Sequence, residues 1–114
     1  MNINVLTVIG KTAVSREGGL KLKKELDRAI ESNEFVEVDF EGVQVYASPF
    51  FNTAIAPYLG KMKFNEMKEK FTCLNLSPIG RKLLNQVIHN AIDFYSKNSD
   101  EQNLLEDQVG NGLE

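Results

Sequence analysis

The sequence has few of the residues on which disulfide scaffolds and metal centres depend. A single cysteine, Cys73, excludes an intramolecular disulfide and favours a reducing, cytoplasmic setting. The single histidine, His89, has no second histidine and no cysteine at ligand spacing, so we do not expect a metal site. Since only His89 could activate Cys73, a catalytic thiol is not expected either. Neither an enzyme nor a cofactor is predicted.

Long apolar runs and concentrated basic charge are also missing. No stretch approaches the roughly 20 apolar residues that cross a bilayer, and residues 1–10 lack the basic region and cleavage site of a signal peptide. Lysine and arginine form no dense stripe of the kind that binds nucleic acid. These absences predict a soluble cytoplasmic protein with neither a membrane nor a nucleic-acid partner.

Acidic residues dominate only the end of the sequence. Residues 98–114 hold five acids and no base, whereas residues 1–97 hold all 13 bases and 11 acids, a net charge of +2. The sequence therefore predicts one domain over residues 1–97 and an acidic, disordered tail over residues 98–114. Within this tail, Leu104, Leu105 and Val109 could form a short amphipathic turn that docks elsewhere.

Stretches rich in valine, isoleucine and phenylalanine predict the strands. These stretches are residues 3–10, 35–40 and 71–76. Further short strands could lie in residues 11–14 and 43–45, because short edge strands are poorly marked in sequence.

Apolar residues at helical spacing predict three helices between and after these strands. They cover residues 20–31, residues 50 onward with a break at Pro57, and residues 77–97. Residues 65–70 are predicted to be a charged connector. The resulting β-α-β-α-β-α order indicates an α/β fold with a mixed, mostly parallel sheet.

Two Ser-Pro pairs precede predicted helices. A serine caps the free amides of a first helical turn and a following proline fits helical geometry, so Ser48-Pro49 and Ser77-Pro78 are both interpreted as caps. For Ser48 the alternative is a hydroxyl that is presented for phosphorylation or binding, and the two roles can coexist. Asp39 closes a predicted strand, where ligands and partners meet in parallel sheets, or it is simply a solvated acid.

The segment before the first predicted helix could bind an anion. Ser15, Arg16, Gly18 and Gly19 combine a hydroxyl, a cation and flexible backbone amides near a helix start. The alternative is a plain helix entry that happens to contain glycine. This segment is the basis of a competing hypothesis, a small-ligand or phosphate-binding module.

Three segments together resemble the STAS domains, named for sulfate transporters and anti-sigma-factor antagonists, and in particular small bacterial STAS-like proteins. They are "SREGG", "VDFEGV…ASPFFN" and "LNLSPIGRKLLNQVI", and the resemblance spans roughly residues 3–95. It implies a β/α sandwich with helices mainly on one face of a mixed sheet. It also implies a regulatory, partner-switching role in signalling, with protein binding controlled by a kinase.

The resemblance places a phosphorylation and partner loop at the start of the second predicted helix. The corresponding loop of the family reads Asp-Ser-Ser-Gly, and here Ser48 falls on its first serine, while Pro49 occupies the place of the serine that is phosphorylated. The implied partner surface includes Phe50, Phe51 and Asn52.

The resemblance places Asp39 on the strand that precedes this loop, and Gly42 and Val43 on the turn after that strand. The resulting hypothesis is a non-catalytic binding module, a monomer or weak homodimer, whose partner is a histidine-kinase-like ATPase or an anti-sigma-type kinase. A homo-oligomeric structural protein is a further alternative.

Overall fold

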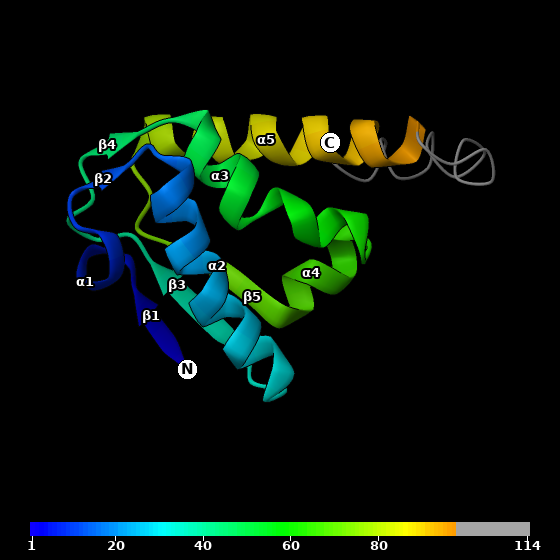
Figure 1. Cartoon of the computed structure of the whole chain (residues 1–114), viewed down its shortest axis with the longest axis horizontal. Helices are drawn as coiled ribbons and strands as arrows, with labels where there is room; N and C mark the ends of the chain where they lie inside the picture. Colours follow the sequence, from blue (N-terminus) through cyan, green and yellow to red (C-terminus); the bar gives the residue numbers. More distant parts are fainter. Residues whose placement is uncertain (98–114) are drawn as a thin grey trace.

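The computed structural model describes residues 1–97, and the predictions made for residues 98–114 lie outside that range. Within it, three short parallel strands form the main sheet: β1 (Asn2–Asn4), β3 (Val36–Asp39) and β5 (Phe71–Leu74), in the order β1-β3-β5 (Figure 1). The register aligns Ile3 with Val38, and Val38 with Cys73. The parallel pairing predicted from the sequence is confirmed.

The main sheet has one buried face and one polar face. Ile3, Val36 and Val38 are buried, whereas Asn2 and Glu37 are exposed on the opposite face. Because side chains of a strand alternate between faces, the helices lie mainly on the side of the buried face (Figure 1). This is the one-sided arrangement that the STAS resemblance implied, and the α/β fold class is confirmed.

The first predicted strand is shorter than expected. Residues 3–10 were predicted to be extended, but β1 ends at Asn4 and α1 (Val5–Ile9) follows. The Asn4 side chain accepts a hydrogen bond of 3.1 Å from the amide of Thr7, and Gly10 ends the helix with φ of 87°. A local cap therefore overrides the strand preference of the valines and isoleucine in this stretch.

The first long helix, α2 (Arg16–Glu31), begins four residues before the predicted start at residue 20. Ser15 is its cap, since its hydroxyl accepts a hydrogen bond of 2.9 Å from the Gly18 amide. Leu22, Leu26 and Ala29 form its buried face.

Proline at position 57 divides the next helical region, as predicted. The helix α3 (Ser48–Ala54) ends before it, and η1 (Ala56–Gly60) continues as a 3₁₀ turn. Tyr58 anchors this turn to α2, because its hydroxyl donates a hydrogen bond of 2.5 Å to Asp27. Lys23 lies over the Tyr58 ring and pairs with Asp27 at 3.0 Å.

The prediction of a charged connector at residues 65–70 is wrong. These residues belong to α4 (Phe64–Lys70). The Glu66 carboxylate accepts a hydrogen bond of 3.5 Å from the Lys63 amide and so caps the first turn of this helix. The apolar residues of α4 that face the core are Phe64, which is partly buried, and Met67, which is buried. Two apolar residues are too few for the periodicity to be recognised in sequence.

The last helix, α5 (Pro78–Lys97), runs along one side of the molecule (Figure 1). Leu84, Val87, Ile88 and Ala91 are buried on its inner face. No helix among residues 1–97 has both the length and the hydropathy needed to cross a membrane.

A second, two-stranded sheet lies at one end of the molecule. It pairs β2 (Thr12–Ala13) with β4 (Val45–Tyr46) in parallel, aligning Thr12 with Val45. These strands confirm the two short strands that the sequence could only suggest. Because β2 leads into α2 and β4 leads into α3, this pairing fixes where both helices begin.

Candidate functional site

Three helices begin at the same end of the molecule, beside the β2-β4 pair (Figure 1). The Ala47 amide, just before α3, donates a hydrogen bond of 3.0 Å to Ala13 just before α2. The start of α5 joins them, because a methyl group added at Gly80 would lie 2.9 Å from the Tyr46 ring. Parallel strands therefore bring the beginnings of α2, α3 and α5 together.

Ser48 is not the helix cap predicted from the Ser-Pro pair. Ala47 occupies the cap position in an extended conformation, and Ser48 is already the first residue of α3. Its hydroxyl makes no capping hydrogen bond within the described part of the chain. Ser77 caps its helix as predicted, since its hydroxyl accepts a hydrogen bond of 3.0 Å from the Gly80 amide. The β4 ladder extends to Ala47, which shifts the cap of α3 by one residue.

Phe50 and Phe51 do not form the partner surface that the resemblance implied. Both side chains are 0% exposed, and their rings meet edge to face at 5.3 Å between centroids. Phe51 also stacks on Tyr46, and both phenylalanines contact Phe40. Large apolar rings this close to the sheet contribute to the core, so a partner cannot reach them while the domain is folded.

The exposed part of the predicted loop carries different side chains. Ser48 is half-buried at the surface, and Pro49 and Asn52 are exposed. Val45 on β4 is 50% exposed and Ile79 on α5 is 68% exposed. These five residues, Val45, Ser48, Pro49, Asn52 and Ile79, are called the Ser48 surface below.

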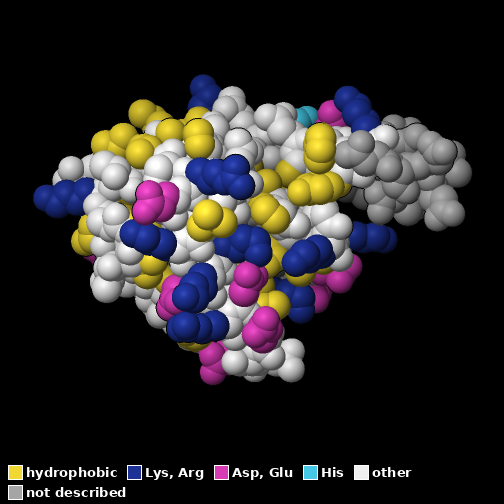
Figure 2. Space-filling model, viewed as in Figure 1, with side chains coloured by type: hydrophobic (Ala, Val, Ile, Leu, Met, Phe, Trp, Pro, Cys, Tyr) yellow, Lys and Arg dark blue, Asp and Glu magenta, His cyan; other side chains and the backbone are white. Residues whose placement is uncertain are grey.

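Hydrophobic side chains gather over this end of the molecule, around β4 and the starts of α3 and α5 (Figure 2). Sequence reasoning missed Val45 and Ile79. The exposure of Ile79 could have been predicted from the helical period. The buried positions of this helix are Gly80, Leu84 and Val87, and Ile79 does not fall on that face. For Val45 nothing in the local pattern distinguishes an exposed strand residue from a buried one.

Asp39 ties the ends of two strands together. One carboxylate oxygen accepts hydrogen bonds of 2.9 Å from the Asn75 side chain and 2.9 Å from the Glu41 amide. Asn75 follows β5 in the left-handed region, with φ of 60°. The bond from Asn75, followed by that from Glu41, lowers the pKa of Asp39 from its ordinary value of 3.8. The geometry gives Asp39 a structural role at the end of β3.

Removing the Asn75 side chain should raise the pKa of Asp39 toward 3.8. Glycine tolerates the left-handed backbone, so Asn75→Gly removes the bond without adding strain. In the folded wild type the pKa is depressed, so Asp39 stabilises the fold above pH 3.8 and this contribution is lost as the pH falls through the folded value.

A carbon-detected NMR titration of the Asp39 carboxyl measures this shift. Asn33→Gly is the matched control, since Asn33 is also left-handed, with φ of 58°, and is not bonded to Asp39. An equal pKa in the wild type and Asn75→Gly would contradict the assignment.

The predicted anion loop is largely accounted for by packing. Ser15 uses its hydroxyl to cap α2. Gly19 is buried against α3, where an added methyl group would lie 2.7 Å from the Phe50 carbonyl oxygen. Gly18 lies inside the first turn of α2, and Arg16 is exposed. The structure brings all four residues to the start of one helix, but two of them have structural tasks there.

Burial makes Cys73 a poor nucleophile. Burial raises the pKa of the thiol to about 12, and the charge of Arg81 acts in the opposite direction. Among residues 1–97, histidine, cysteine, aspartate and glutamate form no group of three that could hold a metal ion.

Comparison with known protein families identifies the class of protein to which this fold belongs. A family described as a STAS-like domain of unknown function matches residues 18–89, and the chain belongs to that family. The match begins in α2, ends in α5 and includes the whole Ser48 surface. Searches of curated proteins and of solved structures find no match.

Proposed function

We propose that this protein is a non-catalytic regulatory module whose Ser48 surface binds a histidine-kinase-like ATPase or an anti-sigma-type kinase. Membership of a STAS-like family supports a regulatory module. The observation that carries the proposal is the pair of exposed apolar side chains, Val45 and Ile79, on the elements that flank Ser48. Apolar side chains that gather at the surface are typical of binding sites, and Figure 2 shows such a gathering around β4 and the starts of α3 and α5.

Ser48 is placed to control such a contact. Its hydroxyl is not used as a cap, so modification would not disrupt α3. Phosphorylation would add a charge of about −1.5 to −2 at the start of α3, whose neighbours β4 and α5 carry the exposed apolar side chains. Since a partner that covers Val45 and Ile79 would have to desolvate that charge, phosphorylation should release it.

The test has two stages, capture of the partner from native cells and titration of the purified ATPase against variants. Ser48→Asp should weaken binding at least about tenfold relative to Ser48→Ala, equal to about 1.4 kcal/mol. Ile79→Asp should weaken it similarly, because a buried charge replaces an apolar contact.

Phe35→Asp is the matched control, since Phe35 is 48% exposed and precedes β3 at the other end of the sheet. Equal affinities of Ser48→Asp and Ser48→Ala would contradict the switch. Full affinity of Ile79→Asp, or capture without an ATPase or kinase, would contradict the proposed surface or partner.

A further inference from the structure

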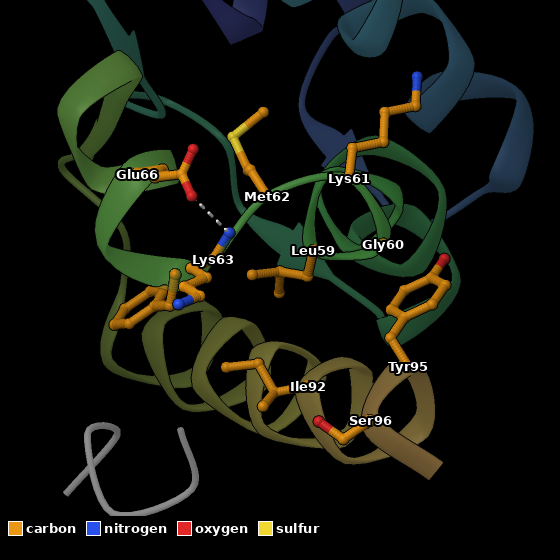
Figure 3. Close-up of a pocket in the computed structure, with 10 residues that line it drawn as sticks. Leu59, Gly60, Lys61, Met62, Lys63, Glu66, Ile92, Tyr95 and Ser96 are labelled. Carbon is orange, nitrogen blue, oxygen red and sulfur yellow. Dashed lines mark hydrogen bonds between the residues drawn. The ribbon is translucent and has the colours of Figure 1, made fainter. Parts of the chain in front are cut away.

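A groove runs beside α5 on the side that faces α4 and β5. Three hollows form it, with volumes of about 270, 770 and 230 Å³. Phe64 at the start of α4 lines all three, so the hollows adjoin one another at this residue. The first hollow lies at the end of α5, between Ile92, Tyr95 and the η1-α4 connection (Figure 3). Together the three hollows are called the α5 groove.

The floor of the α5 groove is mainly apolar in the first and third hollows, whereas the second is lined by Asn85, Gln86, His89 and Asn90 beside Phe64, Pro78 and Ile88. Ile55, Met67 and Leu84 line its inner part, and Ile88 joins the two hollows on either side of it. Leu59 and Ile92 continue this floor at the end of α5, where both side chains point into the hollow (Figure 3). A segment that fills this groove therefore needs apolar side chains of its own.

The rim of the α5 groove is basic. Lys68, Arg81 and Lys82 line it and are exposed, and the Lys68 ammonium lies 5.2 Å from the centre of the Phe64 ring. Lys63 lines the end near Tyr95, while Lys61 points away from the hollow (Figure 3). Within residues 1–97, Glu66 is the only acid that lines the groove. The groove therefore attracts negative charge.

The acidic tail, residues 98–114, has the matching chemistry. Its charged residues are all acids: Asp100, Glu101, Glu106, Asp107 and Glu114. Leu104 and Leu105 stand between the two pairs of acids. The tail also starts at the right place, because Tyr95 and Ser96 line the groove one or two residues before α5 ends at Lys97.

The tail is long enough to follow the groove. From Lys97 back to Arg81, α5 rises about 24 Å, at about 1.5 Å per residue. The tail's 17 residues can span up to about 56 Å, at about 3.3 Å per residue, so even partly extended it reaches Arg81. A segment attached at the groove's own end also has a high effective concentration there.

We propose that residues 98–114 bind in the α5 groove of the same chain. In this arrangement Leu104 and Leu105 would cover the apolar part of the floor, and the acids would pair with Lys68, Arg81 and Lys82 on the rim. The far end of the groove is lined by Pro78, next to Ile79 of the Ser48 surface. The inference rests on the groove and on charge, and it stands whether or not the Ser48 surface binds a kinase.

Paramagnetic relaxation in the full-length chain tests this. A nitroxide is attached through Gln108→Cys in a Cys73→Ala background, which leaves every acid of the tail in place. The amide signals of Phe64, Arg81 and Ile88 should broaden strongly. The broadening should fall severalfold in about 1 M salt, where charges more than about 3 Å apart are screened.

Two double variants distinguish binding in the groove from a general attraction between the acidic tail and basic residues elsewhere on the domain. Arg81→Glu with Lys82→Glu should reduce the broadening severalfold, whereas Lys21→Glu with Lys24→Glu, on exposed positions of α2, should leave it unchanged. Broadening confined to the last turn of α5, or equal in both double variants, would overturn the proposal. Broadening that appears only between separately labelled chains would assign the groove to a second copy and overturn it as well.

Discussion

Replacing Phe51 with alanine should lower the free energy of unfolding by about 3–5 kcal/mol, the range measured for buried aromatic residues. The ring is 0% exposed and contacts Phe40, Phe50 and Tyr46, so its removal leaves a cavity that these rigid neighbours cannot fill. For a small domain this is a large part of a total stability of about 5–15 kcal/mol. Urea denaturation followed by circular dichroism measures the loss.

Asn52→Ala is the control for Phe51→Ala. Asn52 is the next residue of α3 but is exposed, so its replacement should change stability by no more than about 0.5 kcal/mol. If Phe51→Ala were as stable as Asn52→Ala, the ring would not belong to the core. The comparison also bears on the binding experiments. If a Phe51 variant loses partner binding, the loss reports unfolding of the domain and not the removal of a surface contact.

Gly19→Ala should destabilise the domain by about 1–3 kcal/mol, as expected when a packed interior is overfilled. An added methyl group would lie 2.7 Å from the Phe50 carbonyl oxygen and 2.8 Å from the Thr53 side chain. Since one of these neighbours is backbone, α2 and α3 must move apart to admit it. Thermal and urea unfolding of the variant measure the effect.

Gly18→Ala is the matched control, one residue away in the same helix. Its methyl group would meet the Ser15 hydroxyl at 3.3 Å and other neighbours at 3.7 Å, and alanine favours a helix interior by about 1 kcal/mol over glycine. We expect stability equal to or above that of the wild type. Equal destabilisation by both variants would contradict close helix packing as the reason for Gly19.

The strands and long helices could be predicted because their signals are local and strong. Val36 and Val38 alternate with acids, and the buried stripe of α5 persists through Leu84, Val87 and Ile88. The exceptions have identifiable causes. Asn4 caps a helix inside a sequence that otherwise favours a strand, and α4 buries too few residues to show a period.

The candidate site could be predicted only in part, because it depends on contacts between distant segments. The sequence located Ser48 at the start of a helix, but the pairing of Ala47 with Ala13 decides which residue caps that helix. Phe50 and Phe51 belong to a predicted partner loop, yet the turn of α3 directs both into the core. Val45 and Ile79 are exposed on β4 and α5, which the chain brings to one end of the molecule from distant positions in the sequence (Figure 1).

Parallel pairing in both sheets has a consequence for the route by which this chain folds. Residue 2 pairs with residue 37, residue 12 with residue 45, and residue 36 with residue 71, so every described strand pair closes a loop of about 35 residues. No hairpin among residues 1–97 can form early and guide the others. Since the entropy of loop closure is lost before these pairings form, helices should appear first and sheet formation should limit the folding rate.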